Sequence, residues 1–279
     1  MDNLDTYAEN TWCPGCGNFA ILRAFKAAVA ELERQGVSRD RLVVVTGIGQ
    51  HGKMFDYVNL SGFYGLHGRS MASAQGIKLA NPELKVVSFV GDGDALGEGL
   101  AHTIFAAKRN ADITMVLHDN GVYALTTGQY TPVSEKGFRG PSTPAGSVEE
   151  PLHPLSLMLE AGATFIARGY AGRLDHLADL MVQGVQHQGF AFIDVLQPCV
   201  TFNNTWQRYN QLVEVVERPA ATREEALALF SREDKLPIGV LYRREDTPYH
   251  ERVLGDRNPV ADKMSREERQ RKVADFLGG

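Results

Sequence analysis

An aspartate and an asparagine stand where two apolar segments of the chain end. Asp92 lies between two glycines directly after the apolar run 86–90, and Asn120 follows the run 113–117. Because glycine has no Cβ, the turn around Asp92 can bend sharply and let a ligand approach the backbone. A carboxylate there would repel a bare phosphate unless a hard cation lies between them. These residue types therefore indicate a site for a divalent cation and a phosphorylated ligand.

Three cysteines add a second kind of chemistry. Cys13 and Cys16 form a Cys-x-x-Cys pair ahead of the first predicted strand, and Cys199 follows the predicted strand 190–195. The pair is compatible with a redox dithiol, half of a zinc site, or ligands of an iron–sulfur cluster. A thioredoxin-type dithiol would follow a strand, and no predicted strand precedes Cys13. Three cysteines make no disulfide framework, so we expect a reducing, cytoplasmic setting.

The elements that must position these residues alternate between strands and helices. The apolar pattern predicts strands at 41–45, 86–90, 113–117, 164–167 and 190–195, and helices at 19–33, 70–79, 95–109 and 174–186. We therefore expect an α/β fold with a mostly parallel sheet and helices on both faces. Parallel strands place their carboxyl ends at one edge, so Asp92 and Asn120 should face one crevice. Amides at the start of the helix after Gly93 would suit phosphate.

A long segment without predicted elements comes after the predicted strand 113–117 and Tyr123. Residues 125–154 contain five prolines. A long loop inside a compact domain is usually functional, and we expect it to cover the ligand. A flexible linker between domains is the alternative.

The remainder of the chain is predicted to be a helical extension. Residues 1–205 should form the ligand-binding domain, with 206–279 packed on it and partly exposed. Two capping boxes, which begin at Thr222 and Ser265, predict helix starts. A short strand is expected at 238–242.

Composition excludes several classes of function. The chain has 279 residues, of which 43% are hydrophobic and 23% charged, as in an ordinary globular protein. Its net charge of −5 gives no reason to expect binding to nucleic acid or to a membrane surface. No apolar run approaches the length of a membrane span, and residues 1–10 are acidic, unlike a signal peptide.

The Gly-Asp-Gly turn followed by Asn120 resembles the thiamine diphosphate motif. The resemblance implies that Asp92, Asn120 and the backbone oxygen of Val122 hold Mg²⁺. An ordinary turn in a nucleotide-binding fold is the alternative reading of the same residues. With four further motifs, the chain resembles the β subunit of a 2-oxoacid:ferredoxin oxidoreductase over residues 10–205. These motifs are WCPGCGN (12–18), GIGQHGK (47–53), GLHGRS (65–70) and QPCVTFN (197–203).

The resemblance also implies a 4Fe–4S cluster beside the thiamine. Cys13, Cys16 and Cys199 match three of the four family cysteines, and the remaining one falls at Gln50, whose amide replaces a thiolate poorly. We expect His51 to be the fourth ligand, because an imidazole can bind iron and tends to raise the cluster potential. The alternatives are Gln50 itself, a non-protein ligand, a three-iron cluster, zinc in a Cys₃His site, and an inert His51.

Further site residues follow from the same resemblance. Lys53, His67 and Arg69 should lie near the thiazolium or the substrate carboxylate, where positive charge suits a 2-oxoacid. For Arg69 a helix-capping or surface role is an equal alternative. The remaining predicted contacts of the cofactor and its loop are Gly49, Gly91, Gly93, Asp94, Thr127 and Gln129.

The resemblance implies an enzyme that holds only half of its active site. Thiamine enzymes carry the glutamate that activates the aminopyrimidine on a separate module, and only the diphosphate module is recognisable here. We therefore expect an α subunit that supplies this glutamate, an α2β2 assembly, and ferredoxin as the electron acceptor.

The implied reaction converts 2-oxoglutarate and coenzyme A to succinyl-CoA, carbon dioxide and reduced ferredoxin, or the reverse. The compact chain and the PCVTFN turn favour 2-oxoglutarate, and pyruvate is the alternative substrate. Two other classes are a non-redox thiamine-dependent decarboxylase or synthase subunit, and a non-catalytic assembly subunit stabilised by zinc.

Overall fold

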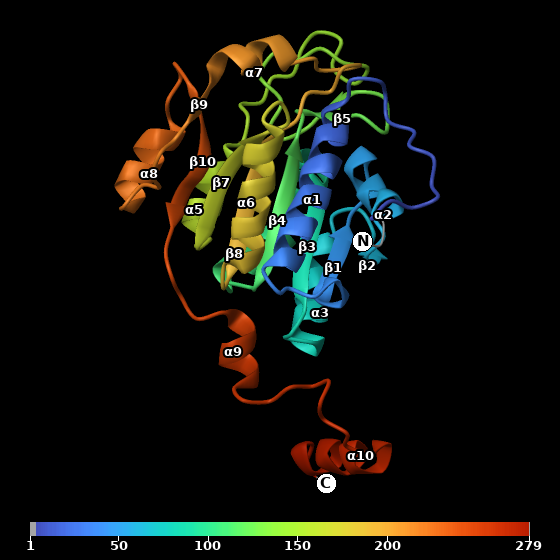
Figure 1. Ribbon diagram of the computed structural model, residues 1–279. Helices are drawn as coiled ribbons and strands as arrows, with labels where there is room; N and C mark the ends of the chain where they lie inside the picture. The colour runs from blue at the N-terminus through green and yellow to red at the C-terminus, as the bar shows by residue number, and fades with distance from the viewer. Residues whose placement is uncertain (1–3, 279) are drawn as a thin grey trace.

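The computed structural model describes residues 4–278, and an eight-stranded sheet runs through its centre (Figure 1). Neighbouring strands are parallel except β10 and β7, which pair antiparallel. The strand order is β2 (Ser61–Tyr64), β1 (Leu42–Thr46), β3 (Lys85–Gly91), β4 (Ile113–Asp119), β8 (Phe190–Leu196), β7 (Phe165–Tyr170), β10 (Leu236–Arg243) and β9 (Val213–Val215). The mostly parallel α/β sheet expected from the sequence is confirmed.

Helices cover both faces of the sheet because its central strands are apolar on both sides. One face packs against α1 (Gly17–Arg34) and α6 (Leu174–Gln186), with a core that contains Phe25 and Leu177. The other face carries α3 (Ser70–Ala80), α4 (Leu100–Lys108), α5 (Pro154–Ala161) and α8 (Arg223–Phe230). Figure 1 shows α1 and α6 in front of the strands.

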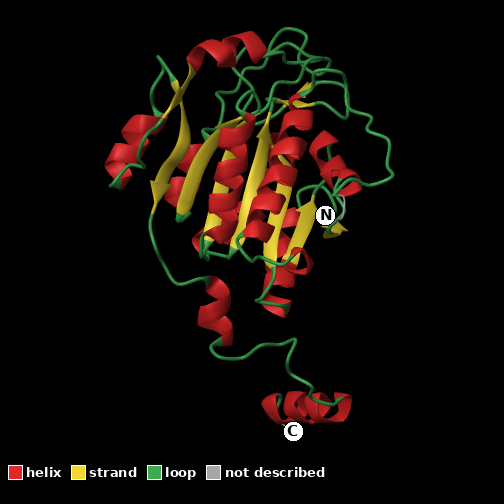
Figure 2. Cartoon of the chain, in the orientation of Figure 1, coloured by secondary structure: helices red, strands yellow, loops and turns green. Residues whose placement is uncertain are grey.

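The remaining elements are short or lie outside the central sheet. They are α2 (Met54–Tyr57), α7 (Trp206–Leu212), α9 (Tyr249–Leu254), α10 (Arg266–Phe276), the 3-10 turns η1 (Arg39–Arg41) and η2 (Gln50–Lys53), and the hairpin of β5 (Val122–Tyr123) and β6 (Gln129–Tyr130). Figure 2 shows long loops gathered at the end of the sheet where α7 lies. Residues 124–153 contribute to these loops and are held by backbone hydrogen bonds such as Leu152 N to Pro132 O at 2.7 Å.

The helix expected at 95–109 is divided in two. Residues Gly93–Glu98 form a π-helical turn, η3, and α4 begins only after Gly99. Such wide turns are frequently found at functional sites. In this turn Asp94 reaches the loop after β1, and Glu98 reaches the hydroxyl of Tyr123 after β4.

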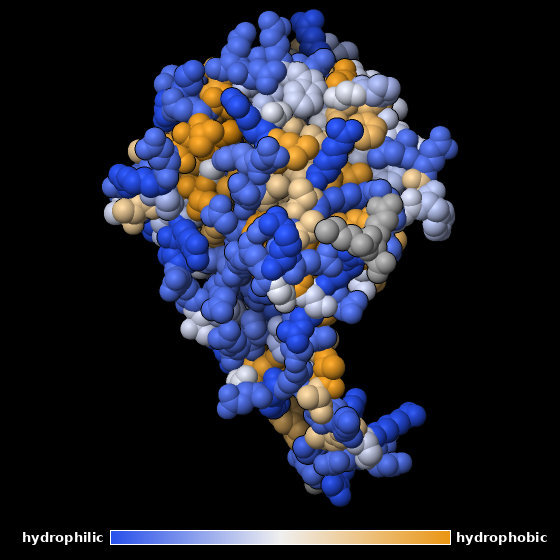
Figure 3. Space-filling view, in the orientation of Figure 1, coloured by the Kyte–Doolittle hydropathy of each residue, from blue (hydrophilic) through white to orange (hydrophobic). Residues whose placement is uncertain are grey.

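The C-terminal segment differs from the expected helical extension. Its strands β9 and β10 join the main sheet, so residues 206–243 complete the domain. Helices begin at both predicted caps, where the hydroxyls of Thr222 and Ser265 accept from the amides of Glu225 and Glu268. Helix α10 has no buried residue and lies apart from the sheet (Figure 1). In the same view, the surface between α10 and the main body is largely hydrophilic (Figure 3). Among the described residues, no helix has the length and apolar character needed to cross a bilayer.

His187 should make the stability of this fold depend on pH. Its side chain is 3% exposed, and Nε2 lies 2.7 Å from Thr164 Oγ1. Burial, followed by the charge of Arg243, lowers its pKa from 6.5 to about 4. Between these values the unfolded chain binds a proton that the folded chain does not, so stability falls as the pH drops from about 6.5 towards 4.

We expect His187→Gln to reduce this loss of stability in acid. Urea unfolding at pH 7 and pH 5 measures the difference. The exposed His153→Gln is the control and should keep the wild-type dependence. An equal loss of unfolding free energy in the wild type and His187→Gln would contradict the prediction.

Candidate functional site

The Asp92 carboxylate is fixed at the carboxyl end of β3 by three donors. Oδ1 accepts from the amide of Gly93 at 2.9 Å, and Oδ2 accepts from the amide of Gly121 at 2.7 Å and from Thr131 Oγ1 at 3.0 Å. The residue is 2% exposed. Burial raises its pKa to about 7, although the three hydrogen bonds act to lower it. A cation at this carboxylate would stabilise its ionised form, so the environment fits a metal ligand.

Asn120 is positioned next to Asp92 by its own hydrogen bonds. Its Oδ1 accepts from the amide of Val122 at 3.0 Å, and its Nδ2 donates to Gln197 Oε1 at 2.8 Å. Asn203 Nδ2 donates to the carbonyl of Asn120 at 2.8 Å. The three predicted magnesium ligands, Asp92, Asn120 and Val122, thus come together at the ends of two adjacent parallel strands.

These predicted ligands line one cleft. The cleft residues come from the segments that follow β1, β2, β3 and β4, from β5, and from the loop after β5. They are Ile48, Gly49, Gln50, His51, His67, Gly91, Asp92, Gly93, Asp94, Asn120, Val122, Tyr123, Ala124, Leu125 and Thr126. Most of the predicted cofactor contacts are therefore in one place.

Four predicted residues are not among those that line the cleft, namely Lys53, Arg69, Thr127 and Gln129. Gln129 lies in β6, where its Oε1 accepts from Thr126 Oγ1 at 2.6 Å. Arg69 Nη1 donates to the carbonyl oxygens of Glu98 at 3.1 Å and Gly68 at 3.3 Å, which ties the loop before α3 to η3. Lys53 ends η2. Thr127 is exposed with a φ of 73°, and its Oγ1 donates to the carbonyl of Thr126 at 2.6 Å.

Gly91 and Gly93 are needed here for the close approach of rings of the protein itself. A Cβ on Gly91 would lie 2.7 Å from His51 Nδ1, and one on Gly93 would lie 2.1 Å from Tyr123 Cε1. The sequence suggested close approach by a ligand, whereas the structure shows that side chains of the cleft already occupy this space. Either glycine would therefore resist substitution even without a cofactor.

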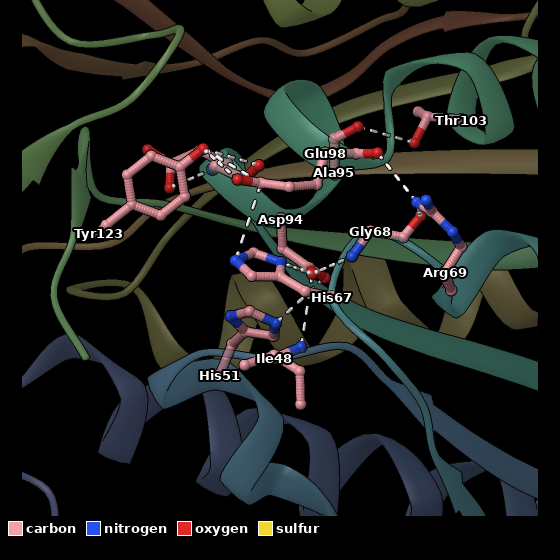
Figure 4. Close-up of polar contacts among 12 residues, drawn as sticks. Ile48, His51, His67, Gly68, Arg69, Asp94, Ala95, Glu98, Thr103 and Tyr123 are labelled. Atoms are coloured by element: carbon pink, nitrogen blue, oxygen red, sulfur yellow. Dashed lines mark hydrogen bonds and ion pairs between the residues drawn. The ribbon is translucent and has the colours of Figure 1, made fainter. Parts of the chain in front are cut away.

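Asp94 connects three segments of the cleft wall (Figure 4). Its Oδ1 lies 2.6 Å from His67 Nδ1 and accepts from the amide of Gly68 at 2.7 Å. Its Oδ2 lies 3.4 Å from His51 Nε2, an ion-pair distance rather than a short hydrogen bond. Burial acts to raise the pKa of Asp94, but His51 and these donors together hold it below its usual value. An ionised Asp94 can therefore orient both imidazoles.

We expect Asp94→Asn to weaken cofactor binding by roughly 10- to 100-fold, the usual effect of removing a group that positions ligands. An amide keeps the size of the side chain but cannot pair with both imidazoles through a negative charge. Titration of thiamine diphosphate into the Mg²⁺-loaded protein measures the effect. Asp56→Asn, on a half-buried residue of α2 outside the cleft, is the control. An unchanged affinity in Asp94→Asn would contradict this role.

The three cysteines line a second cavity. Thr201 Oγ1 donates to Cys13 Sγ at 3.4 Å, and Gln197 Nε2 donates to Cys16 Sγ at 3.6 Å. None of the three forms a disulfide. Burial, followed by the nearby charges of Cys199 and Cys13, raises the pKa of Cys16 to about 11. Bound iron would stabilise the deprotonated thiolates, so this group of thiols is suitable for a metal centre.

Within residues 4–278, no three or more His, Cys, Asp or Glu side chains gather closely enough to hold one metal ion. A 4Fe–4S cluster places its irons at separate corners, so its thiolates need not converge on one point. His51 does not line this cavity, and its ring lies instead between Asp94 and His118. The structure therefore does not bring the expected fourth ligand to the cysteines, whereas Gln50 does line their cavity.

The two cavities are neighbours. Gln50, Asn120 and Ala124 line both of them. Gln197 connects the two sites through its side chain, because Oε1 accepts from Asn120 and Nε2 donates to Cys16. A cofactor in the cleft would therefore lie beside an electron acceptor held by the cysteines.

Sequence reasoning missed several residues that hold the site. Thr131 and Ser134 brace Asp92 and the Gly121 carbonyl from the loop after β6. Tyr123 donates to the Gly93 carbonyl at 3.2 Å, and its pKa is raised, first by burial and then by Glu98. None of these three stands in a recognisable pattern. Gln197 and Asn203 lie within the QPCVTFN motif, but the motif by itself indicates a role only for its cysteine.

Comparisons with known proteins cover nearly the whole chain. Residues 47–195 match the family model described as thiamine pyrophosphate enzyme, C-terminal TPP binding domain. Residues 199–256 match the model for the C terminus of the pyruvate ferredoxin oxidoreductase beta subunit.

Relatives and a solved structure agree with these matches. The chain is 41% identical to a 2-oxoacid:ferredoxin oxidoreductase subunit beta of Sulfolobus sp, over 90% of this chain and 87% of that protein. It is 40% identical to the 2-oxoglutarate synthase subunit KorB of Archaeoglobus fulgidus, over 68% of this chain and 70% of that one. The fold is similar to a 2-oxoglutarate:ferredoxin oxidoreductase from Magnetococcus marinus, solved with 2-oxoglutarate, coenzyme A and succinyl-CoA bound. That match has a TM-score of 0.85 and 34% identity, and covers 100% of this chain and 92% of the other.

Proposed function

The chain belongs to the family of 2-oxoacid:ferredoxin oxidoreductase β subunits, and we propose that it acts on 2-oxoglutarate with thiamine diphosphate, Mg²⁺ and one 4Fe–4S cluster. The observation that carries the proposal is the pair of adjoining cavities. One has the oxygen ligands of a cation site, the other has three thiols, and they share Gln50, Asn120 and Ala124. The bound cofactor would supply a carbanion and an electron sink for decarboxylation.

The residues of the cleft have separate tasks in this proposal. Asp92, Asn120 and the Val122 carbonyl would hold Mg²⁺, which in turn would hold the diphosphate. Asp94 keeps His67 oriented at the cleft wall, where the imidazole can hold or release a proton. The thiolates of Cys13, Cys16 and Cys199 would hold the cluster that receives electrons beside the cleft.

This site is completed by another protein chain in the proposal. No glutamate is among the residues that line the cleft in the part of the chain that is described. An α subunit would supply the glutamate that activates the aminopyrimidine, in an α2β2 assembly. Coenzyme A would take the acyl group, and ferredoxin would take the electrons from the cluster.

The choice of 2-oxoglutarate is supported by the relatives rather than by a residue that recognises its second carboxylate. Lys53 and Arg69 do not line the cleft, so this chain presents neither of those cations to a distal carboxylate. Pyruvate is the second candidate, because residues 199–256 match the pyruvate ferredoxin oxidoreductase model.

Anaerobic purification of the chain with its α subunit tests the proposal. We expect a brown complex that contains thiamine and iron and that reduces ferredoxin in a coenzyme A-dependent reaction, with kcat/KM at least about tenfold higher for 2-oxoglutarate than for pyruvate. A preference for pyruvate would overturn the substrate. A colourless complex with thiamine would indicate a non-redox enzyme, and zinc without thiamine would indicate an assembly subunit.

A further inference from the structure

Gln50, which lines the cysteine cavity, has a buried amide oxygen without a hydrogen-bond partner. Its Oε1 accepts no hydrogen bond from any described residue, although it is fully shielded from solvent. The backbone of Gln50 is fixed, because its carbonyl accepts from Trp12 Nε1 at 2.9 Å, and Trp12 directly precedes Cys13. Buried polar atoms normally have hydrogen-bond partners, so an oxygen without one is a candidate to bind a ligand.

A second glutamine in the same cavity, Gln197, has hydrogen-bond partners for both polar atoms of its side-chain amide. Gln197 Oε1 accepts from Asn120 Nδ2 at 2.8 Å, and its Nε2 donates to the Pro198 carbonyl at 2.9 Å and to Cys16 Sγ at 3.6 Å. Its amide is used entirely within the protein. Of the two glutamines among the described residues that line the cavity, only Gln50 has an amide oxygen without a hydrogen-bond partner.

Three cysteines would leave one iron of the proposed cluster without a protein ligand. A 4Fe–4S cluster has four irons, and three cysteines provide thiolates for three of them. His51 is turned towards Asp94 in the other cavity. Resting on the proposed function, we propose that Gln50 Oε1 binds the fourth iron, which makes this a three-thiolate cluster with one oxygen-bound corner.

Two properties follow from this ligand set. An amide is neutral, so the cluster carries one negative charge fewer than with four thiolates, and its reduction potential is higher. An amide oxygen is a harder and weaker ligand for this iron than a thiolate, so the fourth iron is the one lost on oxidation. Because Gln50 also lines the cofactor cleft, this ligand belongs to the wall between the cofactor and the cluster.

The test compares Gln50→Ala, Gln50→Cys and the wild type, each purified anaerobically with the α subunit. Iron per chain, the midpoint potential, and the EPR signal of a three-iron cluster during mild ferricyanide oxidation are measured. In that oxidation the cluster gives up one electron to ferricyanide and releases one Fe²⁺. We expect the wild type to hold four irons and to lose one readily. Gln50→Ala should be isolated with about three irons, and Gln50→Cys should keep four at a lower potential.

Two controls keep the test specific. Gln197→Ala removes a glutamine that hydrogen-bonds Cys16 but binds no iron in this proposal, so it should keep four irons, at a lower cluster potential. His51→Ala should also keep four irons. Four irons in Gln50→Ala, lost at the wild-type rate, would overturn the inference and leave the proposed function intact. A wild-type complex without iron would overturn the proposed function itself.

Discussion

Asp92→Asn should abolish cofactor binding while leaving the iron content of the protein unchanged. The amide has the volume of the carboxylate, but it lacks the charge that a divalent cation requires. Its nitrogen would also face the Gly121 amide and the Thr131 hydroxyl, which now donate to Oδ2 at 2.7 and 3.0 Å. We expect the affinity for thiamine diphosphate and Mg²⁺ to fall by at least about 100-fold, the upper end of what the loss of a supporting group costs a metal site.

Thiamine content after reconstitution and ferredoxin reduction by the αβ complex measure this loss. Asp112→Asn is a matched control, because Asp112 is a largely buried aspartate that directly precedes β4, at the opposite end of that strand from the cleft, and pairs with Lys78 at 2.6 Å. That control should lower the free energy of unfolding and keep the cofactor affinity of the wild type. Normal thiamine binding by Asp92→Asn would remove Asp92 from the cation site.

Cys199→Ser should have the opposite pattern, with iron lost and thiamine retained. Cys199 is 7% exposed and lies in a tight turn in which its amide and carbonyl pair with Asn203. Serine fits this turn but is a poor ligand for a cluster iron, since its hydroxyl is harder and far less acidic than a thiol. We expect the visible absorption, the iron content and the reduction of ferredoxin to fall close to background.

Thr201→Val is the control within the same cavity. It removes only the hydroxyl that donates to Cys13 Sγ at 3.4 Å, so iron should remain, at a lower cluster potential. A full complement of iron in Cys199→Ser would show that the cavity does not hold the cluster. With Asp92→Asn, the pair of variants separates the two sites, because each should lose one group and keep the other.

The sequence alone was sufficient for the framework of the site. Buried parallel strands are almost wholly apolar, so the runs that became β1, β3, β4, β7 and β8 stand out from their flanking turns. Parallel order then requires that residues after β3 and β4 meet at one edge, which placed Asp92 beside Asn120. The positions of Cys13, Cys16 and Cys199 in their motifs likewise put all three thiols at that edge.

Only the tertiary structure decided what each neighbouring residue does. His51 and Gln50 are adjacent in the chain, yet only Gln50 reaches the cysteine cavity from the turn η2, and the sequence favoured His51 because imidazole is the better iron ligand. Thr131 and Gln197 reach the site from loops whose course no local pattern specifies. Strand positions follow from the tendency to be buried, which differs between residue types and can be read from the sequence. The direction of a side chain in a loop depends instead on the long-range contacts that fix that loop, and those arise only when the chain has folded.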